Sequence, residues 1–172
     1  MKTIVISGHR PDEDGMPGYN VPNEKYNWLI EQFKYCYGQI KPDRIIQGMA
    51  IGADQIAGTA AFELGIPFEA YVPFVGQESI WPQKSKDEYH ALLAKANKVV
   101  VVCEGGYAPF KMELRNRAMV DQLAEPDDIL IACWNGKENG GTWNCIQYAM
   151  KQKKKMVRID PLLKTITGLE NK

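Results

Sequence analysis

Short apolar runs alternate with segments of helical periodicity along this chain, and no other feature constrains its fold more. Runs typical of strands lie at residues 2–7, 43–47, 68–72, 99–103, 128–133 and 155–159. Helical spacing of apolar residues, or a capping residue, predicts helices over residues 24–40, 53–64, 85–96, 112–123 and 142–152. Strands that alternate with helices imply a parallel sheet with helices on both faces. We therefore expect an α/β, Rossmann-like fold.

The predicted elements form one domain over residues 1–172, without a repeat or a linker that would divide it. This length is sufficient to bury a core. We expect Asn23 to cap the first helix, and Ser85 with Glu88 matches a capping box at the third. The run Val-Val-Val-Val-Cys at residues 99–103 favours a central strand that is buried on both faces.

The charge balance and the hydropathy pattern narrow the classes of partner. Lys plus Arg and Asp plus Glu number 21 each, so the formal net charge is zero. Nucleic-acid binders usually carry a basic excess, so this balance argues against a nucleic-acid partner. No apolar segment approaches the ~20 residues that span a bilayer, and we expect no membrane association. The first residues fit a strand better than a signal peptide.

The four cysteines, Cys36, Cys103, Cys133 and Cys145, are not at C-x-x-C spacing. Buried, reduced thiols are the expected state, which suits a cytoplasmic protein. Because zinc-ligand spacings are absent, we expect no metal site. The glycine-containing segments also lack the G-x-G-x-x-G pattern and the P-loop, so neither a dinucleotide cofactor nor a nucleoside triphosphate is indicated.

The segment Gly-Met-Ala-Ile-Gly-Ala-Asp-Gln at residues 48–55 lies between a predicted strand and a predicted helix. Gly48 and Gly52 carry no Cβ, so the backbone can approach a ligand closely there. The N–H groups that open the next helix, beginning at Ala53, favour an anion such as phosphate. Asp54 either caps that helix or accepts hydrogen bonds from a ribose, because a carboxylate placed against phosphate would repel it.

The first strand ends in Ser-Gly-His-Arg-Pro, and ligands of open parallel sheets bind outside the carboxyl ends of strands. Gly8 permits a tight exit from the strand, and the fork of Arg10 matches a phosphate group. His9 offers a donor, or an acid or base near neutral pH. The alternative is a turn in which Arg10 pairs with Asp12 or Asp14.

A long loop at residues 73–82 follows the third predicted strand. Long irregular loops in compact domains are often functional. Gln77 or Glu78 is a candidate to contact the edge of a base, and Trp81 to stack on it. The alternative is that the aromatic side chains of the loop only anchor it on the core.

Two arginines, Arg115 and Arg117, lie on the fourth predicted helix. Residues two apart on a helix diverge, so one of them meets a ligand while the other pairs with an acid. Asp121, four residues after Arg117, is the expected acid. A purely structural role for all three is the alternative.

Asn-Gly-Gly-Thr at residues 139–142 is the second junction between glycine and a helix. Gly140 and Gly141 supply backbone freedom, and Thr142 caps the helix or binds a phosphate oxygen. Together with the first glycine junction on the same sheet edge, this segment completes a predicted cradle for a ligand.

These segments, in this order, resemble the SLOG superfamily, which is named for the Smf/DprA DNA-processing proteins and the LOG-type phosphoribohydrolases. The closer similarity is to its YpsA/YoqJ-like branch, found in bacteria and their phages. It covers nearly the whole chain and rests on residues 7–11, 48–55, 73–78, 115–121 and 140–142. The resemblance implies a Rossmann-like fold that binds nucleotides or nucleotide-derived ligands, and it suggests homo-oligomers.

The enzymes of this superfamily differ from the chain at one informative place. LOG-type hydrolases carry an arginine on the helix before the last glycine motif, and Arg115 is the similar position. They also carry glutamates after the glycine-threonine pair, where this chain has Asn144 and Cys145. Cleavage of an N-glycosidic bond needs an acid or base, so Glu78 or Asp54 would have to substitute.

Three functions follow from these observations, and the first is preferred. It is the binding of a nucleotide or nucleotide-derived small molecule at the carboxyl edge of the sheet, as a sensor or a ligand sink. The second is a phosphoribohydrolase or related N-glycosidase, with Arg115 and Glu78 as catalytic candidates. The third is binding of single-stranded DNA, as in the DNA-processing relatives.

Overall fold

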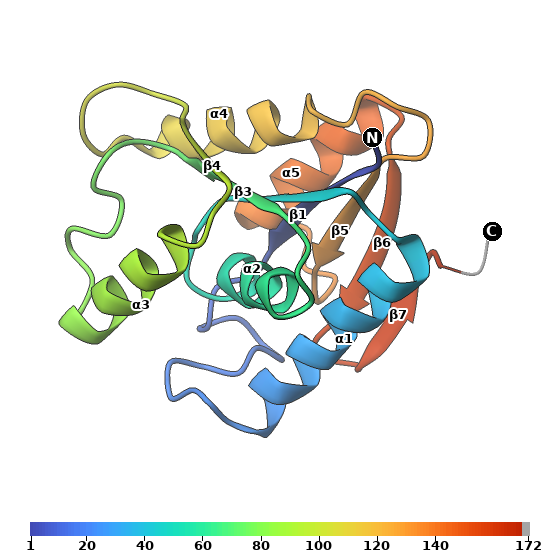
Figure 1. Cartoon of the computed structure of the whole chain (residues 1–172), viewed down its shortest axis with the longest axis horizontal. Coiled ribbons are helices and arrows are strands. Elements are labelled where there is room, and N and C mark those ends of the chain that lie inside the picture. Colours follow the sequence, from blue (N-terminus) through green and yellow to red (C-terminus); the bar gives the residue numbers. More distant parts are fainter. Residues whose placement is uncertain (170–172) are drawn as a thin grey trace.

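Seven strands and five helices make up the computed structural model, which describes residues 1–169 (Figure 1). The strands are β1 (Thr3–Gly8), β2 (Arg44–Gln47), β3 (Phe68–Val72), β4 (Lys98–Val101), β5 (Ile129–Cys133), β6 (Lys155–Asp160) and β7 (Thr165–Thr167). The helices are α1 (Glu24–Ile40), α2 (Ala53–Glu63), α3 (Gln83–Leu93), α4 (Pro109–Val120) and α5 (Gly140–Lys151). Each strand and helix predicted from the sequence is present, whereas the short strand β7 was not predicted.

The strands form one sheet in the order β4-β3-β2-β1-β5-β6-β7, and only the β6–β7 pair is antiparallel. The order reverses at β1, where Ile4 pairs with Ile45 of β2 on one side and with Ile129 of β5 on the other. Ligands of open α/β sheets bind at such a reversal, outside the carboxyl ends of the strands. The topology therefore directs attention to the ends of β1 and β5.

Helices cover both faces of the sheet, as the alternation in the sequence predicts (Figure 1). Ile4 and Ile6 point to the face that α1, α2 and α3 cover, and Val5 points to the face that α4 and α5 cover. Side chains of a strand alternate between the two faces of its sheet, so one strand contributes to both cores. β1 is therefore packed on both faces, and its end borders the candidate site described below.

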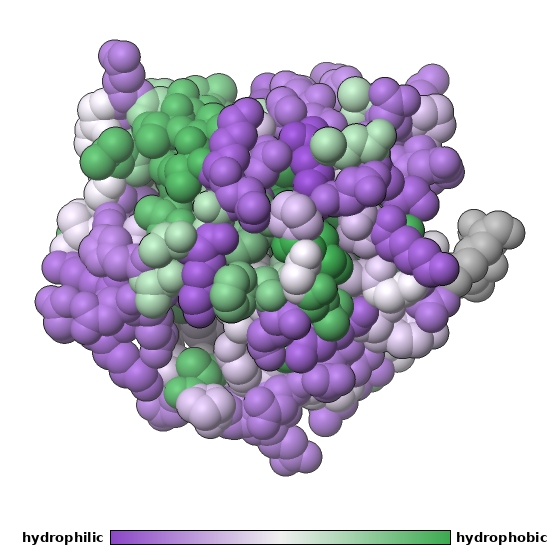
Figure 2. Space-filling model, viewed as in Figure 1, coloured by the Kyte–Doolittle hydropathy of each residue, from purple (hydrophilic) through white to green (hydrophobic). Residues whose placement is uncertain are grey.

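One predicted position in the sheet is wrong. The run at residues 99–103 was expected to form a central strand, but β4 is an edge strand of the sheet, with Val99 and Val101 each 45% exposed. A run of β-branched residues favours a strand without determining its neighbours, because pairing order depends on contacts that are distant in sequence. Figure 2 shows the resulting apolar surface at the upper left, over the region of β3 and β4.

The two predicted helix caps have different outcomes. The side chain of Asn23 accepts a hydrogen bond from the Tyr26 N–H at 2.9 Å, which confirms it as the cap of α1. Helix α3 begins at Gln83 after Pro82, so the predicted capping box of Ser85 and Glu88 is wrong. None of the helices in residues 1–169 is long and apolar enough to cross a membrane.

Candidate functional site

A cavity of about 210 Å³ opens at the reversal of the strand order, above the ends of β1 and β5. Eight of the residues predicted from the sequence line it, namely Gly8, His9, Arg10, Asp54, Arg115, Gly140, Gly141 and Thr142. They come from the end of β1 and the two residues after it, and from α2, α4 and α5, so segments distant in sequence meet at one edge of the sheet. Seven predicted residues do not line the cavity, namely Gly48, Gly52, Ala53, Gln77, Glu78, Trp81 and Arg117.

Two glycines, Gly8 and Gly52, bring the end of β1 and the start of α2 together. A Cβ on Gly8 would lie 2.8 Å from the Cβ of Cys133, closer than side chains pack. Gly52 has a φ of 106°, which other residues rarely adopt, and it precedes Ala53, whose N–H donates to the His9 carbonyl at 3.1 Å. Gly8 and Gly52 therefore allow α2 to begin directly beside the end of β1.

Arg115 is only 5% exposed and is held by backbone oxygen. Its Nη1 donates to the Gly48 carbonyl at 2.5 Å, and its Nε donates to Oδ1 of Asn116 at 2.9 Å. Burial lowers the pKa of the guanidinium, and the nearby charge of Asp54 opposes that shift. A Cβ on Gly48 would lie 2.6 Å from the Arg115 Cζ, so Gly48 makes room for this arginine.

Asp54 is the buried acid of the cavity, with 5% of its surface exposed. Its Oδ2 accepts a hydrogen bond from the Ala50 N–H at 3.3 Å, before the helix begins. The N-cap of α2 is Gly52 and no side chain caps this helix, so the capping role considered for Asp54 is not observed. Burial raises the pKa of the Asp54 carboxyl, and Arg115 is the main opposing influence.

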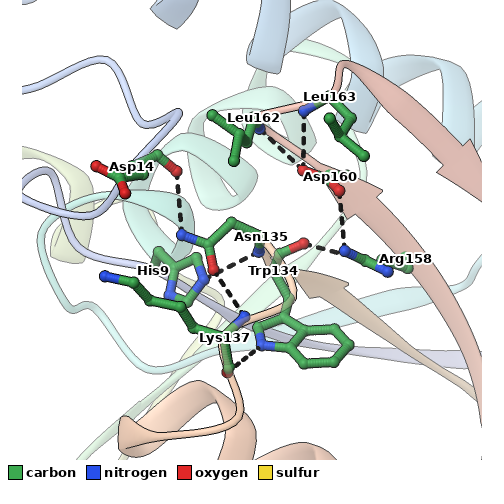
Figure 3. Close-up of polar contacts among 9 residues, drawn as sticks. All are labelled: His9, Asp14, Trp134, Asn135, Lys137, Arg158, Asp160, Leu162 and Leu163. Carbon is green, nitrogen blue, oxygen red and sulfur yellow. Dashed lines mark hydrogen bonds and ion pairs between the residues drawn. The ribbon is translucent and has the colours of Figure 1, made fainter.

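His9 is 6% exposed and its ring is engaged by the loop between β5 and α5 (Figure 3). Its Nε2 lies 3.0 Å from the backbone nitrogen of Asn135, which donates to it. Accepting this bond places the ring proton of a neutral imidazole on Nδ1. Burial lowers the pKa of His9, consistent with the neutral form. His9 therefore positions the loop that precedes α5.

The same loop is tied to other elements in Figure 3. Asn135 donates from Nδ2 to the Asp14 carbonyl at 3.1 Å, and its Oδ1 accepts from the Lys137 N–H at 3.1 Å. Arg158 of β6 donates from Nε to the Trp134 carbonyl at 3.1 Å and pairs with Asp160 at 2.8 Å. These contacts hold the entrance of α5 in place beside the cavity.

Two groups in the cavity wall are suited to an anion. No side chain caps α5, and Gly140, Gly141 and Thr142 in its first turn line the cavity. Uncapped N–H groups at the start of a helix attract negative charge. Arg10 is exposed and forms no ion pair within residues 1–169, so the predicted alternative of pairing with Asp12 or Asp14 is not observed.

The loop before α3 lies away from the cavity. Gln77 donates to the Gly48 carbonyl at 3.3 Å. Oε2 of Glu78 lies 3.1 Å from Nε2 of His90. Trp81 packs edge-on against Tyr89, with ring centroids 5.5 Å apart. These contacts match the alternative in which the aromatic side chains anchor the loop on the core.

Arg117 points away from the cavity. It is paired with Glu113 at 2.7 Å and lies 5.1 Å from the centre of the Tyr148 ring. The expectation of an Arg117–Asp121 pair is wrong, because Asp121 instead accepts a hydrogen bond from the Tyr148 hydroxyl at 2.6 Å. The expectation that Arg115 and Arg117 diverge on the helix is confirmed.

Eight residues of the cavity wall were not singled out from the sequence as binding residues, namely Ile6, Ser7, Asp12, Glu13, Ala50, Met112, Asn116 and Asn139. Two of them could have been found from their neighbours in the sequence, because Asn116 follows Arg115 and Asn139 precedes the glycine pair. The acids Asp12 and Glu13 give the cavity mixed charge. In residues 1–169, no three His, Cys, Asp or Glu side chains are grouped as metal ligands.

Residues 4–164 match the family model described as the YspA SLOG family and named YpsA. The chain is 30% identical over 124 residues to the SPbeta prophage-derived protein YoqJ of Bacillus subtilis (strain 168), covering 63% of this chain and 70% of YoqJ. It is 26% identical over 148 residues to a UPF0398 protein of Bacillus pumilus (strain SAFR-032), covering 81% and 77% of the two chains.

Solved structures of similar fold include two DNA processing proteins A. The Streptococcus pneumoniae protein has a TM-score of 0.61 at 17% identity, with 94% of this chain and 53% of that chain covered. The Helicobacter pylori protein, whose single-stranded DNA binding was studied, has a TM-score of 0.59 at 18% identity, with coverages of 91% and 64%. This chain therefore spans between about half and two thirds of their length. The Moco carrier protein of Chlamydomonas rheinhardtii has a TM-score of 0.51 at 14% identity, with coverages of 91% and 74%.

Proposed function

The chain belongs to the YpsA family of SLOG proteins, and from this premise we propose that it binds the phosphate-bearing end of a nucleotide or nucleotide-derived ligand in the 210 Å³ cavity. The observation that carries the proposal is that one cavity is lined both by a guanidinium that forms no ion pair within residues 1–169 and by the start of a helix that no side chain caps. Arg10 and the first turn of α5 line the same cavity, and each is suited to a phosphate oxygen.

The remaining wall suits a sugar better than further phosphates. Asp54 is buried with a raised pKa, and Asp12 and Glu13 lie in the same wall. Asp12 and Glu13 would repel a polyphosphate, whereas the carboxyl oxygens of Asp54 accept hydrogen bonds from ribose hydroxyls. The cavity is also smaller than the roughly 300–1,000 Å³ of sites that enclose a drug-sized ligand. One phosphate and its ribose therefore match the space, with the base outside it.

Binding without turnover, as in a sensor or a ligand sink, agrees with the chemistry beside α5. The positions after Thr142 are Trp143, Asn144 and Cys145, none of which supplies a carboxylate. Cys145 is buried, and burial raises the pKa of its thiol to about 11, so it is not a nucleophile near neutral pH.

Calorimetric titration with ribose 5-phosphate, AMP, cyclic nucleotides and ADP-ribose tests the proposal. We expect at least one to bind, and Arg10→Ala to weaken its affinity about tenfold, because one charge-assisted contact is lost. Arg117→Ala is the matched control, since Arg117 lies outside the cavity. If wild-type protein binds none of these ligands, or if both variants weaken binding equally, the proposal is wrong.

A second candidate function, N-glycosidic hydrolysis, is favoured by one observation. Asp54 is an acid in the cavity with a raised pKa, whereas Glu78 lies outside it. In this reaction water oxygen bonds to C1′ and loses a proton to solvent, the C1′–N bond breaks, and Asp54 in its protonated form gives its proton to the leaving base. Release of free base from nucleoside monophosphates, followed by chromatography and abolished in Asp54→Asn, would support hydrolysis over simple binding.

The structural similarity to DNA processing protein A shows the fold alone, so single-stranded DNA is a third ligand to test. A single-stranded DNA oligonucleotide should be titrated in the same way, at two salt concentrations. Strongly salt-dependent oligonucleotide binding that AMP does not displace would replace the nucleotide proposal with a DNA-binding one.

A further inference from the structure

A second and larger hollow lies beside the cavity already described. It has a volume of about 420 Å³ and lies between the segment at residues 11–22, the start of α1, and the helices α2 and α3. We call it the aromatic groove. Figure 2 shows the surface hollowed at the lower left, where Figure 1 places α3 and the segment that precedes α1. Its volume falls within the range of small-molecule sites.

Three aromatic side chains line the aromatic groove, among aliphatic, proline and polar residues. Tyr19 and Phe62 line it and stay 58% and 47% exposed, and Tyr26 lines it from the first turn of α1. Ile51 and Leu92 add aliphatic surface. Exposed rings that line a concave surface are available to stack on planar ligands.

A few polar groups face the same space with bonding capacity left. Gln55 donates from Nε2 to the Met49 carbonyl at 3.1 Å, and its Oε1 accepts no hydrogen bond within residues 1–169. The Ser85 hydroxyl has no partner in that part of the chain, and the exposed carboxylate of Glu88 has one contact, with the Lys84 Nζ 3.9 Å from its Oε1. Two acceptors and a hydroxyl match the amino and imino groups at the edge of a heterocyclic ring.

The charges of the aromatic groove suit an uncharged occupant better than a phosphate. Within residues 1–169 no arginine lines it, and the Nζ of its one lysine, Lys95, lies 4.5 Å from the centre of the Phe62 ring. Glu88 would repel an anion. The 210 Å³ cavity differs, because Arg10 and the uncapped start of α5 are available there to bind an anion.

The two hollows share a wall one or two residues thick. Arg10 lines the cavity while Pro11 lines the aromatic groove, and Asp54 and Gln55 divide in the same way. Because successive Cα atoms are about 3.8 Å apart, groups on either side of this wall are within the reach of one nucleotide-sized ligand. We propose that the aromatic groove binds an uncharged planar heterocycle, a nucleobase, by stacking on Tyr19 and Phe62.

This base has two possible sources, which share the same chemistry. It is either the base of the nucleotide whose phosphate occupies the cavity, in which case the inference rests on the proposed function, or the base of a separate nucleoside. Adenosine and AMP distinguish the sources, because adenosine carries no phosphate and ribose 5-phosphate carries no base.

The test measures the affinities of adenosine, AMP and ribose 5-phosphate for four proteins by calorimetry and ligand-observed NMR. These are the wild type, Phe62→Ala, Arg10→Ala and the control Tyr35→Ala. Tyr35 is an exposed aromatic residue of α1 that does not line the groove. Thermal unfolding followed by circular dichroism establishes that each variant folds, and Tyr19→Ala replaces Phe62→Ala if the latter does not.

We expect adenosine to bind the wild type and Phe62→Ala to weaken it about tenfold, as loss of one stacking contact does. Tyr35→Ala leaves adenosine binding unchanged, because Tyr35 does not line the groove. If both Phe62→Ala and Arg10→Ala weaken the binding of AMP, one ligand spans the wall. If only Arg10→Ala weakens it, a separate nucleoside occupies the groove. Absence of adenosine binding, or binding that Phe62→Ala leaves intact, overturns this inference. Ribose 5-phosphate binding that depends on Arg10 would still uphold the proposed function.

Discussion

The guanidinium of Arg115 occupies the space that a side chain on residue 48 would fill. Its Nη1 donates to the carbonyl of Gly48 at 2.5 Å, although the two residues are 67 apart in the sequence. The absent Cβ of Gly48 thus serves a buried arginine, not a ligand. The arginine in turn crosses from α4 to the end of β2 and presents part of its surface to the cavity.

Gly48→Ala is expected to displace Arg115. The new Cβ would lie 2.6 Å from the Arg115 Cζ, so the guanidinium must leave its bond to the backbone. We expect a loss of about 1–3 kcal/mol in the free energy of unfolding, measured in urea, because a buried charged group loses a partner. Weaker ribose 5-phosphate binding should accompany it. Gly38→Ala is the matched control, since no heavy atom lies within 4 Å of its Cβ.

The control should behave in the opposite way. Gly38 lies inside α1, where alanine is favoured over glycine by about 0.5–1 kcal/mol. If Gly48→Ala is as stable as the wild type, the close contact with Arg115 is not a constraint on the fold.

His9 should make the stability depend on pH near neutrality. Burial lowers its folded-state pKa below the ordinary 6.5, so below pH 6.5 the unfolded chain binds a proton that the folded chain resists. The stabilising contribution is therefore complete above 6.5 and is lost as the pH falls through the lowered folded-state pKa. Urea unfolding between pH 8 and pH 5 measures this loss. His9→Gln keeps an acceptor for the Asn135 N–H and should flatten the dependence.

His90 provides the comparison, because it is the other of the two histidines and is exposed on α3. His90→Gln should retain the steep loss of stability below pH 6.5. A dependence that stays steep in His9→Gln, or one that flattens equally in both variants, would contradict the assignment of this loss of stability to His9.

The elements of this fold were predictable because each depends on nearby residues. Strands β1, β3 and β5 were predicted to within one residue at each end, since apolar runs bounded by polar residues mark buried strands. The place of β4 at the sheet edge was not predicted. The sequence near residues 99–103 carries no information on whether a second strand pairs with β4 on its other side.

The site was predictable in outline for a similar reason. Segments after parallel strands meet at one edge, so His9, Asp54 and Thr142 were expected together and line one cavity. Side-chain partners were harder to predict. Arg117 has acids four residues away on both sides, Glu113 and Asp121, and equal spacing cannot select between them. The contact between Gly48 and Arg115 could not be predicted, because the two residues are 67 apart and no local sequence pattern indicates it.

The cysteines should differ in reactivity. Burial raises the pKa of Cys36 to about 12 and of Cys145 to about 11, and it raises that of the buried Cys133 as well. Cys103, which follows β4, is the only one of the four that is not buried. Ellman's reagent should therefore label one thiol rapidly in folded protein and four in urea. Cys103→Ser should remove the rapid phase, and a rapid phase that persists in this variant would contradict the burial of the other three.

The two edges of the sheet differ in how they are protected. Natural edge strands avoid self-pairing through short length, charge or proline. β7 is three residues long, with two exposed threonines. β4 lacks proline, carries Lys98 as its single charge, and leaves Val99 and Val101 half exposed beside the apolar surface in Figure 2. An edge of this kind can pair with its own copy about a two-fold axis, and the net charge of zero does not oppose association.

We therefore expect the homo-oligomer implied by the family resemblance to form through β4. Sedimentation velocity should show a dimer for the wild type and a monomer for the double variant Val99→Lys, Val101→Lys, because four buried charges cannot be accommodated across a two-fold strand pair. Thr165→Lys with Thr167→Lys adds the same charges at the opposite edge and should leave the dimer intact. A wild type that stays monomeric at every concentration, or a dimer that survives the valine substitutions, would place β4 outside any self-association.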